Sequence, residues 1–226
     1  MVETSQGQSR SVKFPTWPRW RVVTLVRRFL LTGLVFPILR IGYSTRIVGR
    51  AHVREITGPC LIVSNHNMHL DIAMLMRSLP FGFRKRVSVA AAANDIFGNP
   101  FMGFWAGFLG NAFPFVNRGA GIRDSLEFVE ELLTDGWHVL IFPEGRLTIV
   151  GPMKPFKTGV GRLAVETGAQ VLPMRIDVVR RGFREGTWWP TPRAKVVVSI
   201  GSPIRFEPGT DYHEATGILE AAVRDA

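Results

Sequence analysis

Short runs of apolar, often β-branched residues alternate along the chain with longer stretches in which apolar residues recur every three or four positions. The short runs predict strands at 46–48, 60–64, 86–91, 112–116, 138–142, 171–176 and 195–200. The longer spacing predicts helices over 71–78, 95–109, 122–134, 159–167 and 212–224. Strands that alternate with helices build sheets with covered faces. We therefore expect an α/β fold, with one mixed, largely parallel sheet flanked by helices.

The first 45 residues lack this alternation. Residues 1–16 are mostly polar and predict a mobile tail, residues 17–45 interleave arginines and tryptophans with apolar residues, and residues 46–226 form the predicted folded domain. The longest uncharged run, 29–39, has 11 residues and also contains Gly33 and Pro37, which should interrupt a helix. A membrane-spanning helix needs about 20 residues. We therefore predict an amphipathic, monotopic docking segment, with an ordinary helix packed on the domain as the alternative.

The formal net charge of +10 is concentrated in the same region. Residues 1–54 contain ten basic residues and one acidic residue, so the remainder is nearly neutral. A nucleic-acid-binding protein would spread its basic residues over a folded face. We expect no nucleic-acid partner, and instead an anionic membrane surface, with the protein monotopic on the cytoplasmic face of the cell membrane. The single cysteine, Cys60, excludes a disulfide framework and a multi-cysteine metal site.

Candidate chemistry begins directly after the predicted strand at 60–64. A carboxylate at the start of the next helix, Asp71, lies five residues after His66, so it can reach and orient the imidazole. A histidine held in this way can act as a general base toward a hydroxyl. Two alternatives remain open: His66, His69 and Asp71 could ligate a metal, or Asn65 and Asp71 could be simple helix caps.

Further charged residues follow other predicted strands. The turn sequence FPEGR places Glu144 and Arg146 after one strand, at the same end of the sheet as His66 if the strands are parallel. Arg118 follows another strand, and Lys157 could add positive charge. Guanidinium groups bind phosphate, and carboxylates accept hydrogen bonds from hydroxyls. These residues therefore indicate a polyol or phosphate ligand, with a surface salt bridge as the alternative for Glu144 and Arg146.

The stretch 96–115 is unusually apolar and aromatic. It contains six phenylalanines and a tryptophan, with glycines between them. It predicts a buried helix followed by a strand. An apolar wall for an acyl chain, or a membrane contact, is compatible with the same helix, because its two sides can face different environments.

Four blocks in order resemble the glycerolipid acyltransferase family, the 1-acylglycerol-3-phosphate acyltransferase-like enzymes. They are NHNMHLD (65–71), FVNR (115–118), FPEGR (142–146) and VLPM (171–174). The resemblance covers about residues 45–205. It differs at Arg146, where the family usually has threonine or serine, at Leu147, where it has arginine, and at Met174.

The resemblance implies an O-acyltransferase. His66 would deprotonate an acceptor hydroxyl and Asp71 would orient it, with acyl-CoA or acyl carrier protein as co-substrate and neither cofactor nor metal. The acceptor would be a lysophospholipid or glycerol-phosphate-like molecule. The residues expected to bind substrate are Asn65, Arg118, Glu144, Gly145, Arg146 and Lys157. A glycolipid or amino-lipid acceptor, a non-catalytic lipid-binding relative and a metal-dependent hydrolase remain as alternatives.

Overall fold

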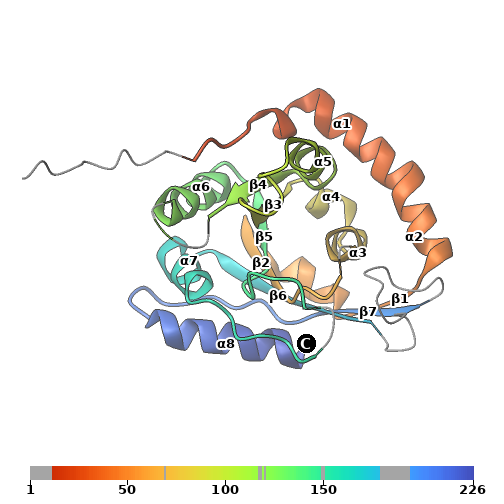
Figure 1. Cartoon of the computed structure of the whole chain (residues 1–226). Helices are drawn as coiled ribbons and strands as arrows, with labels where there is room; N and C mark the ends of the chain where they lie inside the picture. Colours follow the sequence, from red (N-terminus) through yellow and green to blue (C-terminus); the bar gives the residue numbers. More distant parts are fainter. Residues whose placement is uncertain (1–11, 69, 117–118, 120, 149–150, 179–193) are drawn as a thin grey trace, which may run out of the picture.

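A seven-stranded sheet forms the centre of the protein and helices cover both of its faces (Figure 1). The computed structural model describes residues 12–68, 70–116, 119, 121–148, 151–178 and 194–226. The strand order is β1-β7-β6-β2-β5-β3-β4. The strands are β1 Ser44–Val48, β2 Cys60–Ser64, β3 Val87–Ala92, β4 Ala112–Phe115, β5 His138–Ile141, β6 Gln170–Val178 and β7 Lys195–Ile200. The predicted α/β class and flanked sheet are confirmed.

The sheet is mixed. Strands β2 to β6 are parallel to one another, whereas β7 is antiparallel to β6 and β1 is parallel to β7. The five parallel strands therefore begin at one end of the sheet and finish at the other. We call these the amino end and the carboxyl end of the sheet. In open α/β sheets the carboxyl end is where ligands usually bind.

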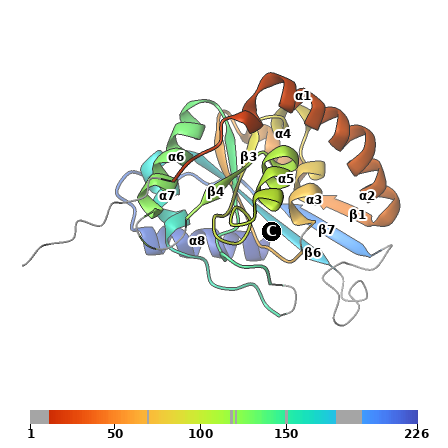
Figure 2. The same ribbon diagram turned by 45° about the horizontal axis from the view of Figure 1, so that its top comes forward.

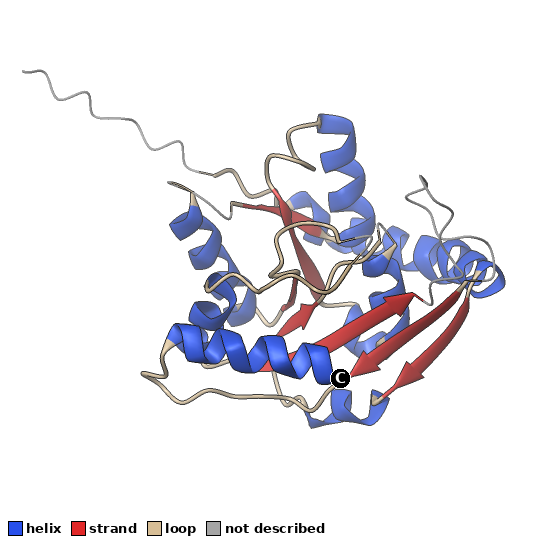
Figure 3. Ribbon diagram, turned by 60° about the horizontal axis from the view of Figure 1, so that its bottom comes forward, coloured by secondary structure: helices blue, strands red, loops and turns tan. Residues whose placement is uncertain are grey.

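Two hydrophobic clusters lie on the two faces of the sheet. Side chains alternate along β2, so Cys60 and Ile62 pack on one face while Leu61 and Val63 pack on the other, and all four are buried. Figure 3 shows α8 crossing one of these faces. The helices of the folded domain are α3 Asp71–Ser78, α4 Phe81–Arg84, α5 Pro100–Gly110, α6 Ile122–Thr134, α7 Gly159–Thr167 and α8 Tyr212–Asp225.

The predicted boundaries agree with the structure to within two residues except around α5. The helix expected from residue 95 begins at Pro100, because the Asn99 side chain accepts hydrogen bonds from the N–H groups of Phe101 and Met102 and so caps it there. Two short elements of the folded domain were not predicted, namely α4 and the 3₁₀ helix Arg50–Glu55, and a third short element, the 3₁₀ turn Trp17–Arg19, precedes α1. All three are too short to give a clear hydrophobic period.

The N-terminal segment forms one continuous helical run, contrary to the expected interruption at Gly33 and Pro37. It consists of α1 Arg21–Leu30, a π-helical turn η2 Leu31–Val35 and α2 Phe36–Gly42. The N–H of Phe36 donates to the carbonyl of Leu31, five residues back. This wider turn accommodates Pro37, which has no N–H to donate. The run Arg21–Gly42 is 22 residues long and is long and apolar enough to cross a membrane, by length and composition.

This helical run lies along the outside of the domain in both Figure 1 and Figure 2. Near its start, the buried Arg27 guanidinium donates to the carbonyls of Pro18 (2.6 Å), Gly107 (3.0 Å) and Phe108. Two of those carbonyls belong to the last turn of α5, where the helix dipole favours a cation. Phe36 and Leu39 are buried in the core farther along. Both halves of the run are therefore attached to the domain.

Part of the predicted tail is packed on the domain. Residues 1–11 lie outside the described part of the chain, but residues 12–16 are packed rather than mobile. Phe14 stacks on Phe128 with ring centroids 4.0 Å apart, and the N–H of Val12 donates to Asp124 at 3.1 Å. These contacts with α6 explain why the predicted mobility does not hold for residues 12–16. A polar sequence alone does not reveal that one aromatic side chain within it is anchored.

Helix α5 places its large apolar side chains outward. Its buried positions include Gly103 and Gly107, whereas Phe101 is 71% exposed and Phe104 is 50% exposed. A Cβ at Gly107 would lie 3.0 Å from the Trp17 ring, so a larger residue here would push that ring outward. The prediction of a buried helix is therefore wrong for the aromatic side of α5. The observed exposure agrees with the alternative, a contact with lipid.

Candidate active site

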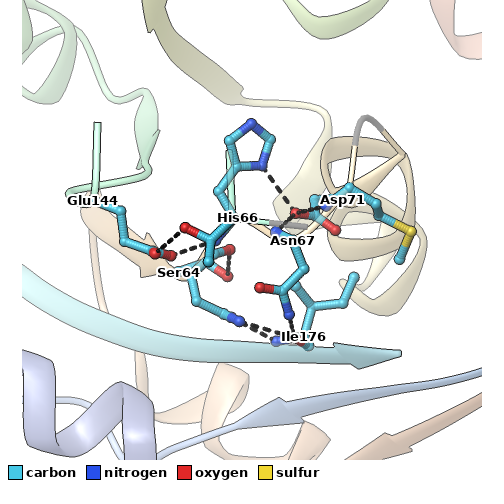
Figure 4. Close-up of polar contacts among 9 residues, drawn as sticks. Ser64, His66, Asn67, Asp71, Glu144 and Ile176 are labelled. Carbon is cyan, nitrogen blue, oxygen red and sulfur yellow. Dashed lines mark hydrogen bonds and ion pairs between the residues drawn. The ribbon is translucent and has the colours of Figure 1, made fainter. Parts of the chain in front are cut away.

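His66 and Asp71 meet at the carboxyl end of β2 (Figure 4). The loop after β2 turns into α3, whose first residue is Asp71. His66 Nδ1 lies 2.9 Å from Asp71 Oδ2, the geometry of a hydrogen bond in which a protonated Nδ1 donates. The backbone N–H groups of Asn67 (2.6 Å) and Met68 (3.0 Å) donate to the same oxygen. The loop is thus wrapped around one carboxylate oxygen, which sets the direction of the imidazole.

Asp71 is fully buried, and its second oxygen, Oδ1, has no hydrogen-bond partner within the described residues. Burial raises the pKa of this carboxyl above its ordinary value, while the hydrogen bond and charge of His66 act in the opposite direction. An anionic Asp71 therefore depends on its N–H donors and on the imidazole.

The His66 ring is held on a second side by an aromatic residue. It stacks on Phe142 with centroids 4.3 Å apart, and its side chain keeps 23% exposure. The other ring nitrogen, Nε2, points away from Asp71 in Figure 4 and has no hydrogen-bond partner within the described residues. Nε2 is thus free to exchange a proton with a bound molecule.

Glu144 connects the turn after β5 to the His66 loop. Its Oε1 accepts the N–H of His66 at 2.8 Å, while Oε2 accepts the Thr148 hydroxyl and the Lys154 N–H, both at 2.9 Å. The side chain is 4% exposed. These contacts differ from the expected one, because both carboxylate oxygens are bonded to the protein rather than directed at an acceptor. The surface salt bridge considered for Glu144 and Arg146 is not formed.

Gly145 makes this turn possible. Its φ of +68° lies in the left-handed region that residues with a Cβ rarely adopt. The turn brings Glu144 back under His66 and leaves the next side chain, Arg146, exposed. Since β2 and β5 are parallel neighbours, the predicted placement of the two motifs at one end of the sheet is confirmed.

Asn65 is used inside the fold. Its amide donates to the Ile176 carbonyl at 2.9 Å and its Oδ1 accepts the Ile176 N–H at 2.8 Å, which extends the pairing of the loop with β6. At 3% exposure this side chain has no polar atom available to a substrate, contrary to the prediction. It does not act as a helix cap either. Asn67, which sequence reasoning did not single out, donates to the same carbonyl at 2.6 Å.

A cavity of about 360 Å³ lies at the carboxyl end of β3, β4 and β5. Gly145, Arg146 and Lys157 line it, together with residues that follow β3 and β4. Three of the predicted substrate-binding residues are therefore brought together. Arg118 lies outside the described residues.

The metal-site alternative finds no added support. Within the described residues, no group of three or more histidine, cysteine, aspartate or glutamate side chains is arranged to hold a metal ion. His69, the third ligand considered, lies outside the described part.

Thr148 also supports the His66 loop, and the sequence analysis missed it. Its N–H donates to the His66 carbonyl at 2.7 Å and its hydroxyl donates to Glu144. No local pattern marks a threonine for this role.

Residues 44–177, more than half of the chain, match the model of the family described as Acyltransferase. The chain belongs to this family.

Its relatives include 1-acyl-sn-glycerol-3-phosphate acyltransferases. One from Brassica napus, a chloroplastic protein, is 32% identical over 72% of this chain and 45% of its own length. The alpha form from Mus musculus is 33% identical over 58% of this chain and 45% of its own length. The chain therefore spans about half the length of these curated relatives.

A solved structure shares the fold. The 1-acyl-sn-glycerophosphate acyltransferase of Thermotoga maritima superposes with a TM-score of 0.62 at 21% identity, over 91% of this chain and 82% of that one. At this identity the likeness establishes the architecture alone.

Proposed function

We propose that this protein is an O-acyltransferase that transfers a fatty acyl group from a thioester to a hydroxyl of a 1-acylglycerol-3-phosphate-type lysophospholipid. The observation that carries the proposal is the buried Asp71 carboxylate on Nδ1 of His66, with Nε2 of the same ring free. This pair needs neither a metal nor a covalent enzyme intermediate, because the acceptor itself supplies the nucleophilic oxygen. The names of the relatives support the acceptor class.

The reaction follows from this geometry. Nε2 of His66 takes the proton of the acceptor hydroxyl as its oxygen attacks the thioester carbonyl carbon. The carbon–sulfur bond then breaks, an ester remains on the acceptor, and the imidazolium returns the proton to the departing thiolate. Asp71 stabilises the imidazolium that forms between these steps. Acyl-CoA and acyl carrier protein both offer such a thioester, and we propose them as alternative donors with no further cofactor.

We assign Glu144 and Asn65 to positioning, since their contacts hold the His66 loop against β5 and β6. Arg146 and Lys157 line the adjacent cavity and supply positive charge for the acceptor phosphate. Gly145 allows the acceptor to approach the backbone of the turn. Arg118 remains a predicted phosphate contact from the motif alone.

We also propose that the protein docks on the membrane through α1, α2 and α5 without crossing it. The exposed side of these helices carries Phe29 (68%), Ile41 (83%) and the aromatic residues of α5, and Trp20, directly before α1, is 61% exposed. The buried Arg27 and Leu39 attach the helical run to the domain, so the whole run lies in the interface. The cationic N-terminal quarter favours the anionic cytoplasmic leaflet, where thioester donors occur.

The decisive experiment compares His66→Ala with His213→Ala, since His213 is exposed on α8 and belongs to none of the loops that hold His66. We expect His66→Ala to lower the rate of ester formation by at least about a thousandfold, and His213→Ala to change it by less than about twofold. Circular dichroism establishes that both variants fold. Full activity in His66→Ala contradicts the mechanism, and wild-type protein that binds lipid without turnover identifies a non-catalytic relative.

The acceptor is tested separately with purified protein in mixed micelles. A radiolabelled acyl thioester is offered with lysophosphatidic acid, lysophosphatidylcholine or a glycolipid. We expect lysophosphatidic acid to be preferred, and Lys157→Gln to raise its KM more than it lowers kcat, because the lysine binds phosphate in the ground state and the transition state alike. Equal use of the three acceptors contradicts a phosphate-directed site.

A further inference from the structure

A second cavity, of about 380 Å³, lies at the amino end of the sheet, away from His66. On the domain side it is lined by residues that precede β3, β4 and β5, namely Arg86, Asn111 and Trp137. On the other side it is lined by α1 and η2. Because the strands are parallel, this cavity and the proposed active site are at opposite ends of the same strands.

The cavity combines apolar walls with a strong positive charge. Leu31, Phe36 and Leu109 contribute apolar surface, and the lining contains seven arginine or lysine residues but no aspartate or glutamate. One of the seven, Arg27, is occupied by backbone carbonyls. The other six are Arg19, Arg21, Arg28, Arg84, Lys85 and Arg86. Such a lining fits an amphiphile with a negative headgroup.

None of these six cations forms an ion pair within the described residues. The carboxylate whose charge acts on Arg19 is Asp135, which lies outside the lining, and burial lowers the pKa of Arg19 more than Asp135 raises it. Arg28 lies over the ring of Phe81 at 4.3 Å. The cations of the cavity are therefore not paired with a carboxylate among the described residues.

Three buried polar atoms in this lining also lack a hydrogen-bond partner within the described residues. They are Arg19 Nη1, Thr24 Oγ1 and Asn111 Oδ1. Asn111 is 2% exposed, and its amide nitrogen already donates to the Val87 carbonyl at 3.0 Å. Buried polar groups normally have partners, because an unpaired one costs about 1–3 kcal/mol. Guanidinium donors suit a phosphate, and a free carbonyl oxygen suits a ligand hydroxyl.

We propose that this cavity binds one anionic phospholipid, with its phosphate among Arg19, Arg28 and Arg86 and a headgroup hydroxyl near Asn111. An acyl chain would follow the apolar wall toward Leu25, which lines the cavity and is also 49% exposed. The cavity therefore adjoins the side of α1 that we propose to face the membrane. This site does not depend on acyl transfer, and it would fasten the docking helix to a single lipid molecule.

The test uses the full-length protein and dihexanoyl phosphatidylglycerol below its micelle concentration, which provides both phosphate and hydroxyls without a membrane surface. Isothermal titration calorimetry should show one molecule bound per chain. Arg28→Gln should weaken binding about tenfold, since a charge-assisted contact to phosphate is lost. Arg40→Gln is the matched control, because Arg40 is exposed on the same helical run but does not line the cavity.

Thr24→Val separates binding from folding. It removes an unpaired buried hydroxyl, so the Tm of the free protein should stay constant or rise while affinity for the lipid falls. Equal loss of binding in Arg28→Gln and Arg40→Gln would overturn the proposal in favour of a diffuse charge effect. Equal affinity for dihexanoyl phosphatidylcholine would also overturn it, and so would equal affinity for inorganic phosphate. Binding should persist in Lys157→Gln, whereas its loss there would place the lipid in the proposed active site.

Discussion

The two ends of the sheet use polar groups in opposite ways. At the carboxyl end, Asn65 and Glu144 are buried and satisfied by backbone and hydroxyl groups, and the free Nε2 of His66 projects from that framework. At the amino end, Arg19, Thr24 and Asn111 are left with buried atoms that lack partners within the described residues. The polar framework at the first end is largely satisfied within the protein, whereas the second end leaves several buried polar atoms without a partner among the described residues.

This difference has a physical meaning. A catalytic group must be held in place before the reaction, because reorganisation during the reaction raises its barrier. A lipid site has no such requirement and can tolerate groups that are satisfied only on binding. Asp71 Oδ1 is the exception at the carboxyl end, since it too lacks a partner in the described part of the chain.

Among the substitutions that test this difference between the two ends, Asp71→Asn should have the largest effect. The amide oxygen can still accept the N–H groups of Asn67 and Met68, but it carries no negative charge to stabilise the imidazolium. We expect kcat to fall by about a thousandfold or more with little change in KM. Single-turnover measurements at saturating acceptor would show this loss.

The same variant should not be less stable than the wild type near neutral pH. Burial raises the pKa of Asp71 in the folded state, so its contribution to stability is present below the unfolded pKa and is lost as the pH rises through the folded one. The uncharged amide introduced by Asp71→Asn avoids that loss. Urea titration at neutral pH measures the difference. A variant that unfolds more readily would show that the carboxylate is structural.

Arg27→Met tests how the amino end is assembled. It leaves the carbonyls of Pro18, Gly107 and Phe108 without their charged donor. We expect a loss of about 3 kcal/mol in the free energy of unfolding, since hydrogen bonds to charged groups contribute about 1.5–3 kcal/mol each. Arg40→Met, at an exposed position, is the control. Equal stability of the two variants would contradict the attachment of α1 through this arginine.

His138, at the start of β5, should make this end of the sheet sensitive to acid. Burial, and then the charge of Arg86, lowers its pKa to about 4 from an ordinary value near 6.5. The stability it provides is present above pH 6.5 and is lost as the pH falls toward 4. The loss should be up to about 3 kcal/mol. His138→Phe keeps an aromatic ring stacked on Phe83. As the pH is lowered, the denaturation midpoint of this variant should fall less steeply than that of the wild type.

Glu144→Gln should have the smallest effect of these changes. The amide can keep the bond from the His66 N–H but presents an NH₂ group to the Lys154 N–H, so one buried donor loses its acceptor. We expect a cost of about 1–2 kcal/mol in stability and about a tenfold fall in kcat/KM. Glu127→Gln on the exposed side of α6 serves as the control. An unchanged kcat/KM would show that His66 does not need this support.

The sequence predicted the strands, a largely parallel sheet and the meeting of two motifs at one end of it, because hydrophobic period and the alternation of strands with helices are local patterns. It did not predict the roles of Asn65 and Glu144. Asn65 bonds to Ile176, which is distant in the chain, and Glu144 accepts the backbone N–H of Lys154, which no residue type marks in advance. The continuity of the N-terminal helix was also missed, since a single π-helical turn absorbs Pro37.

The sequence by itself determined the fold class, the family resemblance and the concentration of positive charge in the first quarter of the chain. Periodicity, motif spacing and the positions of charged residues can all be read along the chain without knowing which distant residues are in contact. Only the tertiary structure decided which polar atoms are satisfied and which are not, because that depends on contacts between elements far apart in the chain. The support of the His66 loop by Glu144 and the unpaired groups of the second cavity both depend on such contacts.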